Sequence, residues 1–155
     1  MQMDQIFKIG FLTENMLAKT KAEALEELVN TLIKSGLKLD SAKVIEVLQQ
    51  REKLGSTGIG DGLAIPHGKI PSLDEIVVAF GRSKKGVDFD SLDGKPVHIF
   101  FLLLAPENSV GQHLKALARI SKMLKKANFR QKLIETDSKS DLYKLIIEQN
   151  ETCPL

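Results

Sequence analysis

Residues 55–69 read Gly-Ser-Thr-Gly-Ile-Gly-Asp-Gly-Leu-Ala-Ile-Pro-His-Gly-Lys. The pattern of residue types along the chain changes at this stretch. Its first half holds too many glycines to continue a helix, and its second half is too apolar for a plain linker. Pro66 fixes its own φ and favours an extended conformation at Ile65. Gly68 lets the backbone beside His67 approach a neighbour closely or adopt a positive φ. The stretch therefore predicts that the imidazole of His67 is presented from a stiffened strand end.

Two helices are expected before this stretch. Thr20 and Glu23 have the spacing of a capping box, and an apolar helical face follows until Gly36 stops the helix. That face consists of Ala22, Leu25, Leu28, Val29, Leu32 and Ile33. Asp40 caps a second helix, which ends before Gly55.

Two strands are expected after it, at residues 76–80 and 97–104, with a turn at Asp93-Gly94 between them. The second strand is apolar at nearly every position. This pattern is typical of a central strand in a sheet that is covered on both faces.

A third helix is expected to begin at Ser109, with Gln112 at the position of the reciprocal cap. Its inner face is expected to consist of Val110, Leu114, Leu117, Ala118, Ser121 and Leu124. Two shorter helices follow, around residues 129–135 and 141–147. Helices, then strands, then helices again indicate one layered α/β or α+β domain over residues 1–155, with no internal repeat and no domain boundary.

The composition is that of an ordinary globular protein, with 43% hydrophobic and 27% charged residues and a net charge of +2. This charge balance does not point to nucleic acid as a partner. The longest uninterrupted apolar run, residues 99–105, is far shorter than the roughly 20 residues of a membrane-spanning helix, so no membrane insertion is expected. The N-terminus lacks a signal-peptide pattern, and the single cysteine, Cys153, has no internal disulfide partner and falls in an expected tail. We therefore expect a cytoplasmic protein.

The glycines do not form a nucleotide-binding motif. Gly-x-x-x-x-Gly-Lys-Ser/Thr is absent, and Gly58-x-Gly60 lacks the third glycine of a dinucleotide-binding loop. The histidines, His67, His98 and His113, show no close ligand spacing with one another or with Cys153. We expect neither a metal nor a cofactor.

Three side chains have the chemistry of a phosphoryl-transfer site. The imidazole of His67 is a good nucleophile at neutral pH and can form a labile covalent intermediate. Arg51 shares or borders the buried face of the second helix, and a guanidinium there suits the oxygens of a phosphate. His113 lies in the first turn of the third helix, where the helix dipole favours a neutral imidazole beside an anion. We expect these groups, with backbone N–H groups of the glycine-rich segment, to hold one phosphate.

The segment from Gly58 to Lys69 resembles the active-histidine signature of the enzyme IIA domains of the bacterial sugar phosphotransferase system. The similarity is to the fructose/mannitol type, which includes the nitrogen-related branch. Further matches are Arg51-Glu-Lys-Leu-Gly, Ala79-Phe-Gly-Arg-Ser, Pro96 through Pro106, and His113-Leu-Lys-Ala-Leu. The resemblance extends from about residue 7 to residue 147.

This resemblance implies a mixed central sheet flanked by helices on both faces, and a phosphotransferase component that carries a phosphohistidine. The phosphoryl donor is then the carrier protein HPr, and the acceptor is a cysteine or histidine of an enzyme IIB partner that serves the uptake of fructose or a related sugar. By position, His67 is the nucleophile, phosphorylated on Nε2. Arg51 matches the arginine that contacts the phosphate, and His113 matches the second active-site histidine. His98 stands where fructose-type members often have a histidine, which favours the fructose branch.

The sequence also allows other interpretations. A regulatory protein target could read the phosphorylation state of the same histidine, as in the nitrogen-related branch, or His67 could be vestigial in an interaction module. His98 alternates with buried positions of its strand, so we interpret it as structural. Basic residues recur on the third helix opposite its expected apolar face, at Lys115, Arg119, Lys122 and Lys126. Such a stripe is typical of a solvated surface, although an acidic partner could dock there.

Overall fold

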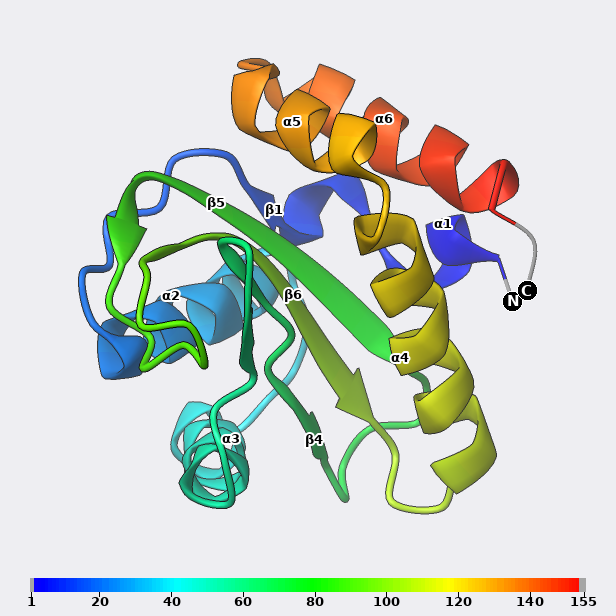
Figure 1. The fold of residues 1–155 in the computed structure, drawn as a ribbon. Coiled ribbons are helices and arrows are strands. Elements are labelled where there is room, and N and C mark those ends of the chain that lie inside the picture. The colour runs from blue at the N-terminus through cyan, green and yellow to red at the C-terminus, as the bar shows by residue number, and fades with distance from the viewer. Residues whose placement is uncertain (1, 154–155) are drawn as a thin grey trace.

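A mixed sheet of six strands lies between two layers of helices in the computed structural model, which describes residues 2–153 (Figure 1). The strands are β1 (Leu12–Thr13), β2 (Gly58–Gly60), β3 (Leu63–Ala64), β4 (His67–Lys69), β5 (Val77–Val87) and β6 (Val97–Ala105). The helices are α1 (Met3–Ile6), the 3₁₀ helix η1 (Ile9–Phe11), α2 (Lys21–Lys34), α3 (Ser41–Lys53), α4 (Val110–Leu124), α5 (Ala127–Glu135) and α6 (Lys139–Glu151). This architecture confirms the predicted fold class.

Strand β6 lies at the centre of the sheet. It pairs antiparallel with β5 along one edge and parallel with β3 and β4 along the other, in the order β1-β5-β6-β3-β2 with β4 also beside β6. Every residue of β6 except His98 is buried, as its apolar sequence predicts. Strand β5 continues to Val87, well beyond the predicted end at Phe80, because its polar, glycine-containing end carries little strand signal of its own.

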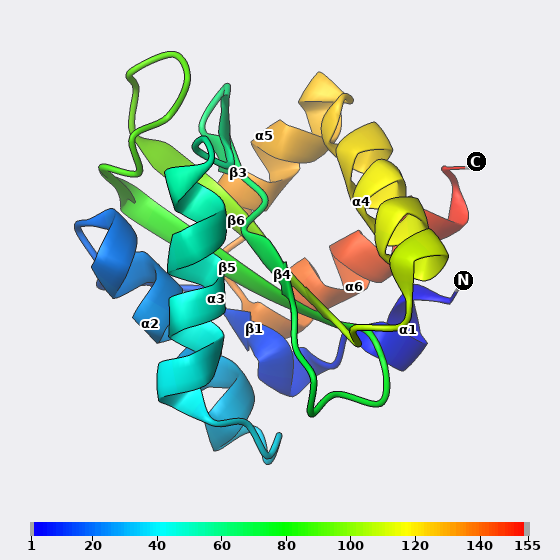
Figure 2. The ribbon, with the colours of Figure 1, turned by 90° about the horizontal axis from the view of Figure 1, so that it is seen from below.

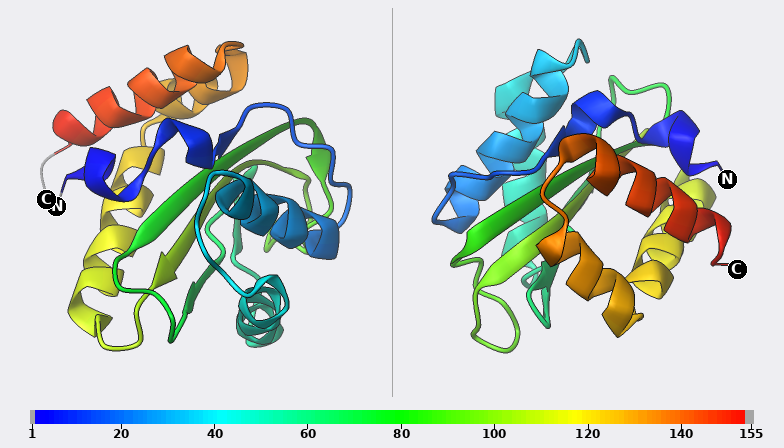
Figure 3. Two further views of the ribbon diagram at one scale, coloured as in Figure 1. Left: turned by 180° about the vertical axis from the view of Figure 1, so that it is seen from behind. Right: turned by 90° about the horizontal axis from the view of Figure 1, so that it is seen from above.

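Helices α2 and α3 cover one face of the sheet, and α4, α5 and α6 lie on the other, as Figure 2 and the right-hand view of Figure 3 show. None of the helices within residues 2–153 combines the length and the apolar content needed to cross a membrane.

Helix α2 has the predicted ends. The Thr20 hydroxyl accepts the backbone N–H of Glu23, and the Glu23 carboxylate accepts the backbone N–H of Thr20, which completes the capping box. Gly36 follows the helix with φ 104°, a conformation that glycine adopts without a steric penalty. Of the predicted apolar face only Ala22 is wrong: it is exposed, and Ala24 is buried in its place.

The predicted inner face of α4 is only partly correct: Leu124 is buried and Leu117 is half-buried against the core, but the N-terminal part of the face points to solvent. Val110 and Leu114 are 53% and 59% exposed. The side of the helix that packs into the protein consists of His113, Ala116, Ile120, Met123 and Leu124. The expected capping box is not formed either, since the Ser109 hydroxyl donates to the carbonyl of Pro106. Apolar residues occur on two sides of this helix, so its tertiary neighbours decide which side is buried.

Two arginines connect distant segments through backbone carbonyls. Arg119 was expected on a solvated face, but its guanidinium donates to carbonyls at the end of α6, that of Cys153 among them. Cys153 itself is buried and is not part of a free tail. Arg82 of β5 is 1% exposed and donates to the carbonyls of Leu133 and Thr136 at the end of α5. Both guanidinium groups thus bind carbonyls at and just beyond the C-terminal ends of helices, where acceptors are available.

Candidate functional site

His67 is the first residue of β4, in register with Leu103 of β6. Its Nδ1 lies 2.8 Å from the carbonyl oxygen of Ile65, and its Nε2 lies 3.2 Å from Nε of Arg51. A carbonyl oxygen only accepts hydrogen bonds and a guanidinium only donates them. Both contacts therefore require the same tautomer, with the hydrogen on Nδ1 and the lone pair on Nε2. In this tautomer Nε2 is the ring nitrogen that can accept a bond to another atom.

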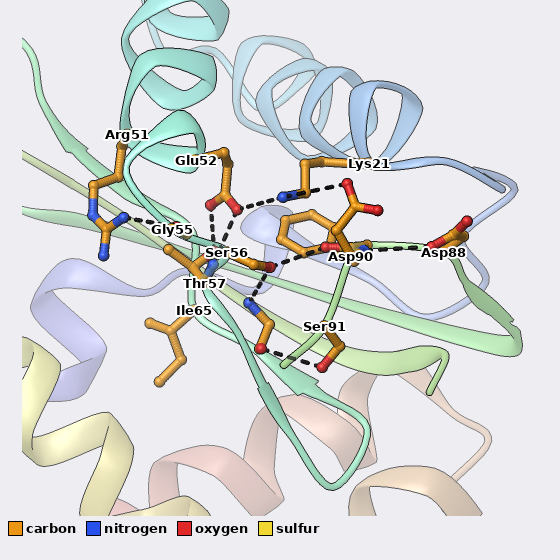
Figure 4. A network of polar contacts seen from close by, with 12 residues as sticks. Lys21, Arg51, Glu52, Gly55, Ser56, Thr57, Ile65, Asp88, Asp90 and Ser91 are labelled. Carbon is orange, nitrogen blue, oxygen red and sulfur yellow. Dashed lines mark hydrogen bonds and ion pairs between the residues drawn. The ribbon is translucent and has the colours of Figure 1, made fainter. Parts of the chain in front are cut away.

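Arg51 reaches the ring from the last turn of α3. Its Nη1 donates to the carbonyl of Gly55 at 2.9 Å (Figure 4). Its Nε donates to Nε2 of His67. These two contacts hold the planar guanidinium beside the imidazole of His67, and a guanidinium has further donors for the oxygens of an anion.

His113 approaches His67 from the beginning of α4. The two ring centroids are 5.5 Å apart and the ring planes are inclined at 59°. His113 is 7% exposed, and its buried Nδ1 has no hydrogen-bond partner within the described chain. A buried polar atom without a partner is rare in folded proteins and is expected where a ligand supplies the missing contact. Arg51, His67 and His113, predicted to converge, thus lie together.

The surroundings lower the pKa of both histidines. For His67 burial is the largest cause, and the positive charge of Arg51 adds to it, whereas the Ile65 carbonyl and the Glu52 carboxylate act in the opposite direction. Burial also lowers the pKa of His113, helped by His67 and Lys69. Both rings are therefore neutral at neutral pH, and His67 keeps its lone pair.

The three side chains line a surface depression of about 480 Å³. Its lining consists of Val47, Gln50, Arg51, Leu54, His67, Gly68, Lys69 and His113. The charged members, Arg51 and Lys69, are both cationic, so the depression suits an anion. A larger depression of about 680 Å³ lies against α2, but four glutamates line it, so it disfavours an anion.

Gly68 is needed for close packing, and its φ is not positive. A Cβ atom at this position would lie 2.8 Å from Cγ1 of Val47 on α3. Of the two roles predicted for this glycine, close approach is the one that the structure shows. The absence of a side chain lets α3 lie directly against β4, which brings Arg51 within reach of His67.

The structure does not bring the glycine turn to His67. Gly60 and Gly62 have φ of 100° and 75° in the turn between β2 and β3, and the turn lies against Asp93 and His98. None of residues 58–62 lines the depression in the part of the chain that the structure describes. Within the glycine-rich segment the depression is instead lined by Gly68, beside His67 and Lys69, so a contact from backbone N–H groups to a phosphate stays a prediction for this end of the segment alone. His98 is also outside the depression, and its Nδ1 lies 2.8 Å from the carbonyl oxygen of Ser83, as a structural role predicts.

Sequence reasoning missed a polar network beside Arg51 (Figure 4). Oε1 of Glu52 accepts the backbone N–H of Thr57 and pairs with Nζ of Lys21, both at 3.0 Å, and Oε2 accepts the Thr57 hydroxyl. A signal existed in the sequence, because Glu52 continues the buried helical stripe of Val44 and Leu48 at intervals of four residues. A carboxylate in such a stripe must have partners.

The sequence matches the family described as "Phosphoenolpyruvate-dependent sugar phosphotransferase system, EIIA 2" over residues 5–149. The nitrogen regulatory protein of Bradyrhizobium diazoefficiens is 44% identical over 127 residues, which cover 82% of this chain and 82% of that protein. The PTS system fructose-specific EIIABC component of Bacillus subtilis is 39% identical over 137 residues, which cover 88% of this chain but 22% of that protein.

Among solved structures, nitrogen regulatory protein IIA-Ntr from Neisseria meningitidis matches with a TM-score of 0.85 and 35% identity. The match covers 93% of this chain and 98% of that chain. The chain is thus similar both to proteins named for nitrogen regulation and to proteins named for fructose.

Proposed function

The chain belongs to the EIIA 2 family of the phosphoenolpyruvate-dependent sugar phosphotransferase system, and on this basis we propose that it carries a phosphoryl group on Nε2 of His67. The observation that carries the proposal is the pair of contacts at the two ring nitrogens of His67, from which the tautomer follows. The carbonyl of Ile65 occupies Nδ1, and Nε2 keeps a lone pair beside a guanidinium. Such a ring can attack phosphorus without first losing a proton.

In the proposed reaction, Nε2 of His67 forms a bond to phosphorus while the bond between phosphorus and the donor breaks. The ring gains positive character, which the Nδ1–H···O=C contact with Ile65 stabilises. Arg51 releases Nε2 and donates to the phosphate oxygens, and the unpartnered Nδ1 of His113 is suited to a further oxygen. Burial makes a charged ring unfavourable, so the group is not held too firmly for onward transfer.

We propose HPr as the donor and an enzyme IIB as the acceptor, in the cytoplasm, for uptake of fructose or a related sugar. The relative from Bacillus subtilis, named fructose-specific, supports this acceptor. His98, which by its position in the sequence favours the fructose branch, lies outside the depression. A second candidate is a regulatory carrier whose phosphorylation state controls a protein target. This regulatory candidate is favoured by the match to the nitrogen regulatory protein of Bradyrhizobium diazoefficiens, which covers 82% of that protein.

Incubation with phosphoenolpyruvate, enzyme I and HPr should label the protein with acid-labile phosphate. The matched variants are His67→Ala, which should not be labelled, and His98→Ala, which should be labelled normally. Persistent labelling of His67→Ala would remove His67 from the reaction. Mixing the labelled protein with a fructose-type IIB then separates the two candidates, because rapid loss of label to IIB supports transport and its retention supports regulation.

A further inference from the structure

A continuous path of hydrogen bonds connects Glu52 to the imidazole of His67. Oε1 of Glu52 accepts the backbone N–H of Thr57 at 3.0 Å, and the Thr57 carbonyl accepts the N–H of Ile65 at 3.0 Å. The Ile65 carbonyl in turn accepts the hydrogen of Nδ1 of His67 at 2.8 Å. Figure 4 shows the first part of this path, where Glu52, Thr57 and Ile65 lie one after another.

The path and the direct contact of Arg51 begin at neighbouring residues in the last turn of α3. Arg51 contacts Nε2 of His67 at 3.2 Å, whereas Glu52 reaches Nδ1 through Thr57 and Ile65. One turn of helix therefore controls both nitrogens of the ring. The two residues also act in opposite directions on the pKa of His67: the charge of Arg51 lowers it and the charge of Glu52 raises it.

The ion pair with Lys21 does not by itself explain a carboxylate at this place. The side chain of Glu52 is 4% exposed, and a buried ion pair contributes little net stability because both charges lose water. Its partner, Lys21, is the first residue of α2, where the positive end of the helix dipole disfavours a cation. Nζ of Lys21 also lies over the ring of Phe89, 4.9 Å from its centroid, so this cation has a contact besides Glu52. Among the residues that the structure describes, Glu52 otherwise accepts hydrogen bonds from Thr57, from its backbone N–H and from its hydroxyl.

We propose that Glu52 is a positioning residue for phosphoryl transfer at His67. It holds Thr57 and, through Thr57, the Ile65 carbonyl that keeps the ring hydrogen on Nδ1 and the lone pair on Nε2. The inference rests on the proposed function for its reaction. Its effect on the tautomer concerns the unphosphorylated protein and can be measured without any transfer.

The test compares Glu52→Gln with Glu27→Gln as a matched control. The carboxylate of Glu27 also holds a loop by accepting two backbone N–H groups, those of Leu17 and Ala18, at 2.9–3.0 Å, but this loop has no link to His67. Thr57→Val removes the hydroxyl that donates to Glu52, and Thr57→Ser retains it. The measurements are ¹⁵N NMR of the His67 ring and the rate of phosphorylation by the small donor phosphoramidate.

We expect the wild type, Glu27→Gln and Thr57→Ser to show the hydrogen on Nδ1 and equal rates. Glu52→Gln should mix the two tautomers and react about tenfold more slowly, since small displacements of a reacting group are costly. Thr57→Val should change the tautomer ratio and the rate in the same direction as Glu52→Gln, but by a smaller amount.

The proposal is overturned if folded Glu52→Gln has the tautomer and the rate of Glu27→Gln. If Glu52→Gln does not fold, the comparison of Thr57→Val with Thr57→Ser tests the proposal instead. The proposal is then overturned if these two variants have the same His67 tautomer and the same rate of phosphorylation. If the wild type accepts no phosphate at all, the proposed function fails while the tautomers still test the positioning role.

Discussion

Replacing Gly68 by alanine should lower the free energy of unfolding by about 1–3 kcal/mol, the usual cost of overpacking. The added Cβ would lie 2.8 Å from Cγ1 of Val47 and 3.6 Å from Cδ2 of Leu48. Carbon atoms pack best at about 3.5–4.0 Å, so the first contact overlaps by about 1 Å and the second does not. Val47 is β-branched and helical, which leaves it one preferred rotamer, so it cannot rotate away cheaply. Helix α3 has to move away from β4.

The same displacement should slow phosphorylation of His67, because Arg51 moves with α3 and its contact with Nε2 is already 3.2 Å. In Val47→Ala the obstructing methyl group is absent. The double variant Gly68→Ala/Val47→Ala should therefore be about as stable as Val47→Ala alone, with a coupling energy of about 1–3 kcal/mol.

Urea unfolding followed by circular dichroism measures these differences, since the chain has no tryptophan for fluorescence. Gly111→Ala is the control. Gly111 lies in α4 with nothing within 4 Å of the added Cβ, so alanine should stabilise by about 0.5–1 kcal/mol. A Gly68→Ala protein as stable as the wild type, or one that Val47→Ala fails to rescue, would refute the steric explanation.

Three further substitutions or conditions test the site and the fold. Arg51→Ala should raise the pKa of His67, because it removes one of the charges that lower it, and an NMR titration that shows no rise would mean that burial alone sets the value. The lowered pKa values of His67 and His113 mean that below about pH 6.5 the unfolded chain binds protons that the folded protein does not. The free energy of unfolding should then fall as the pH drops from 7.5 to 5.5, and fall less in His67→Gln/His113→Gln, as urea midpoints at the two pH values report. Thr20→Ala should lower the unfolding free energy by about 0.5–2 kcal/mol through loss of the capping box, whereas Thr20→Ser should not.

Local sequence signals predicted the ends of α2 and the start of α3, because a cap depends on residues three or four positions apart. Thr20 with Glu23 and Asp40 with Lys43 are such pairs, and both form. The orientation of α4 is not local. It depends on which side meets β6, α5 and α6, so exposed Leu114 could not be distinguished from a core residue by periodicity alone.

The same distinction between local and long-range information applies to the candidate site. The motif predicted that Arg51, His67 and His113 meet, and they do. The contact that sets the tautomer involves a backbone carbonyl, that of Ile65. Every residue has such a carbonyl, so the pattern of side-chain types cannot predict this contact. The role of Glu52 required knowing where the chain after α3 turns back, which depends on long-range pairing of β3 and β4 with β6.

The most direct measurement is NMR of the phosphorylated protein labelled with ¹⁵N in its histidines. We predict a one-bond coupling between phosphorus and Nε2 of His67, with the ring hydrogen still on Nδ1. A phosphate on Nδ1 of His67, or on His98 or His113, would contradict the proposal that the tautomer of His67 prepares Nε2 for transfer.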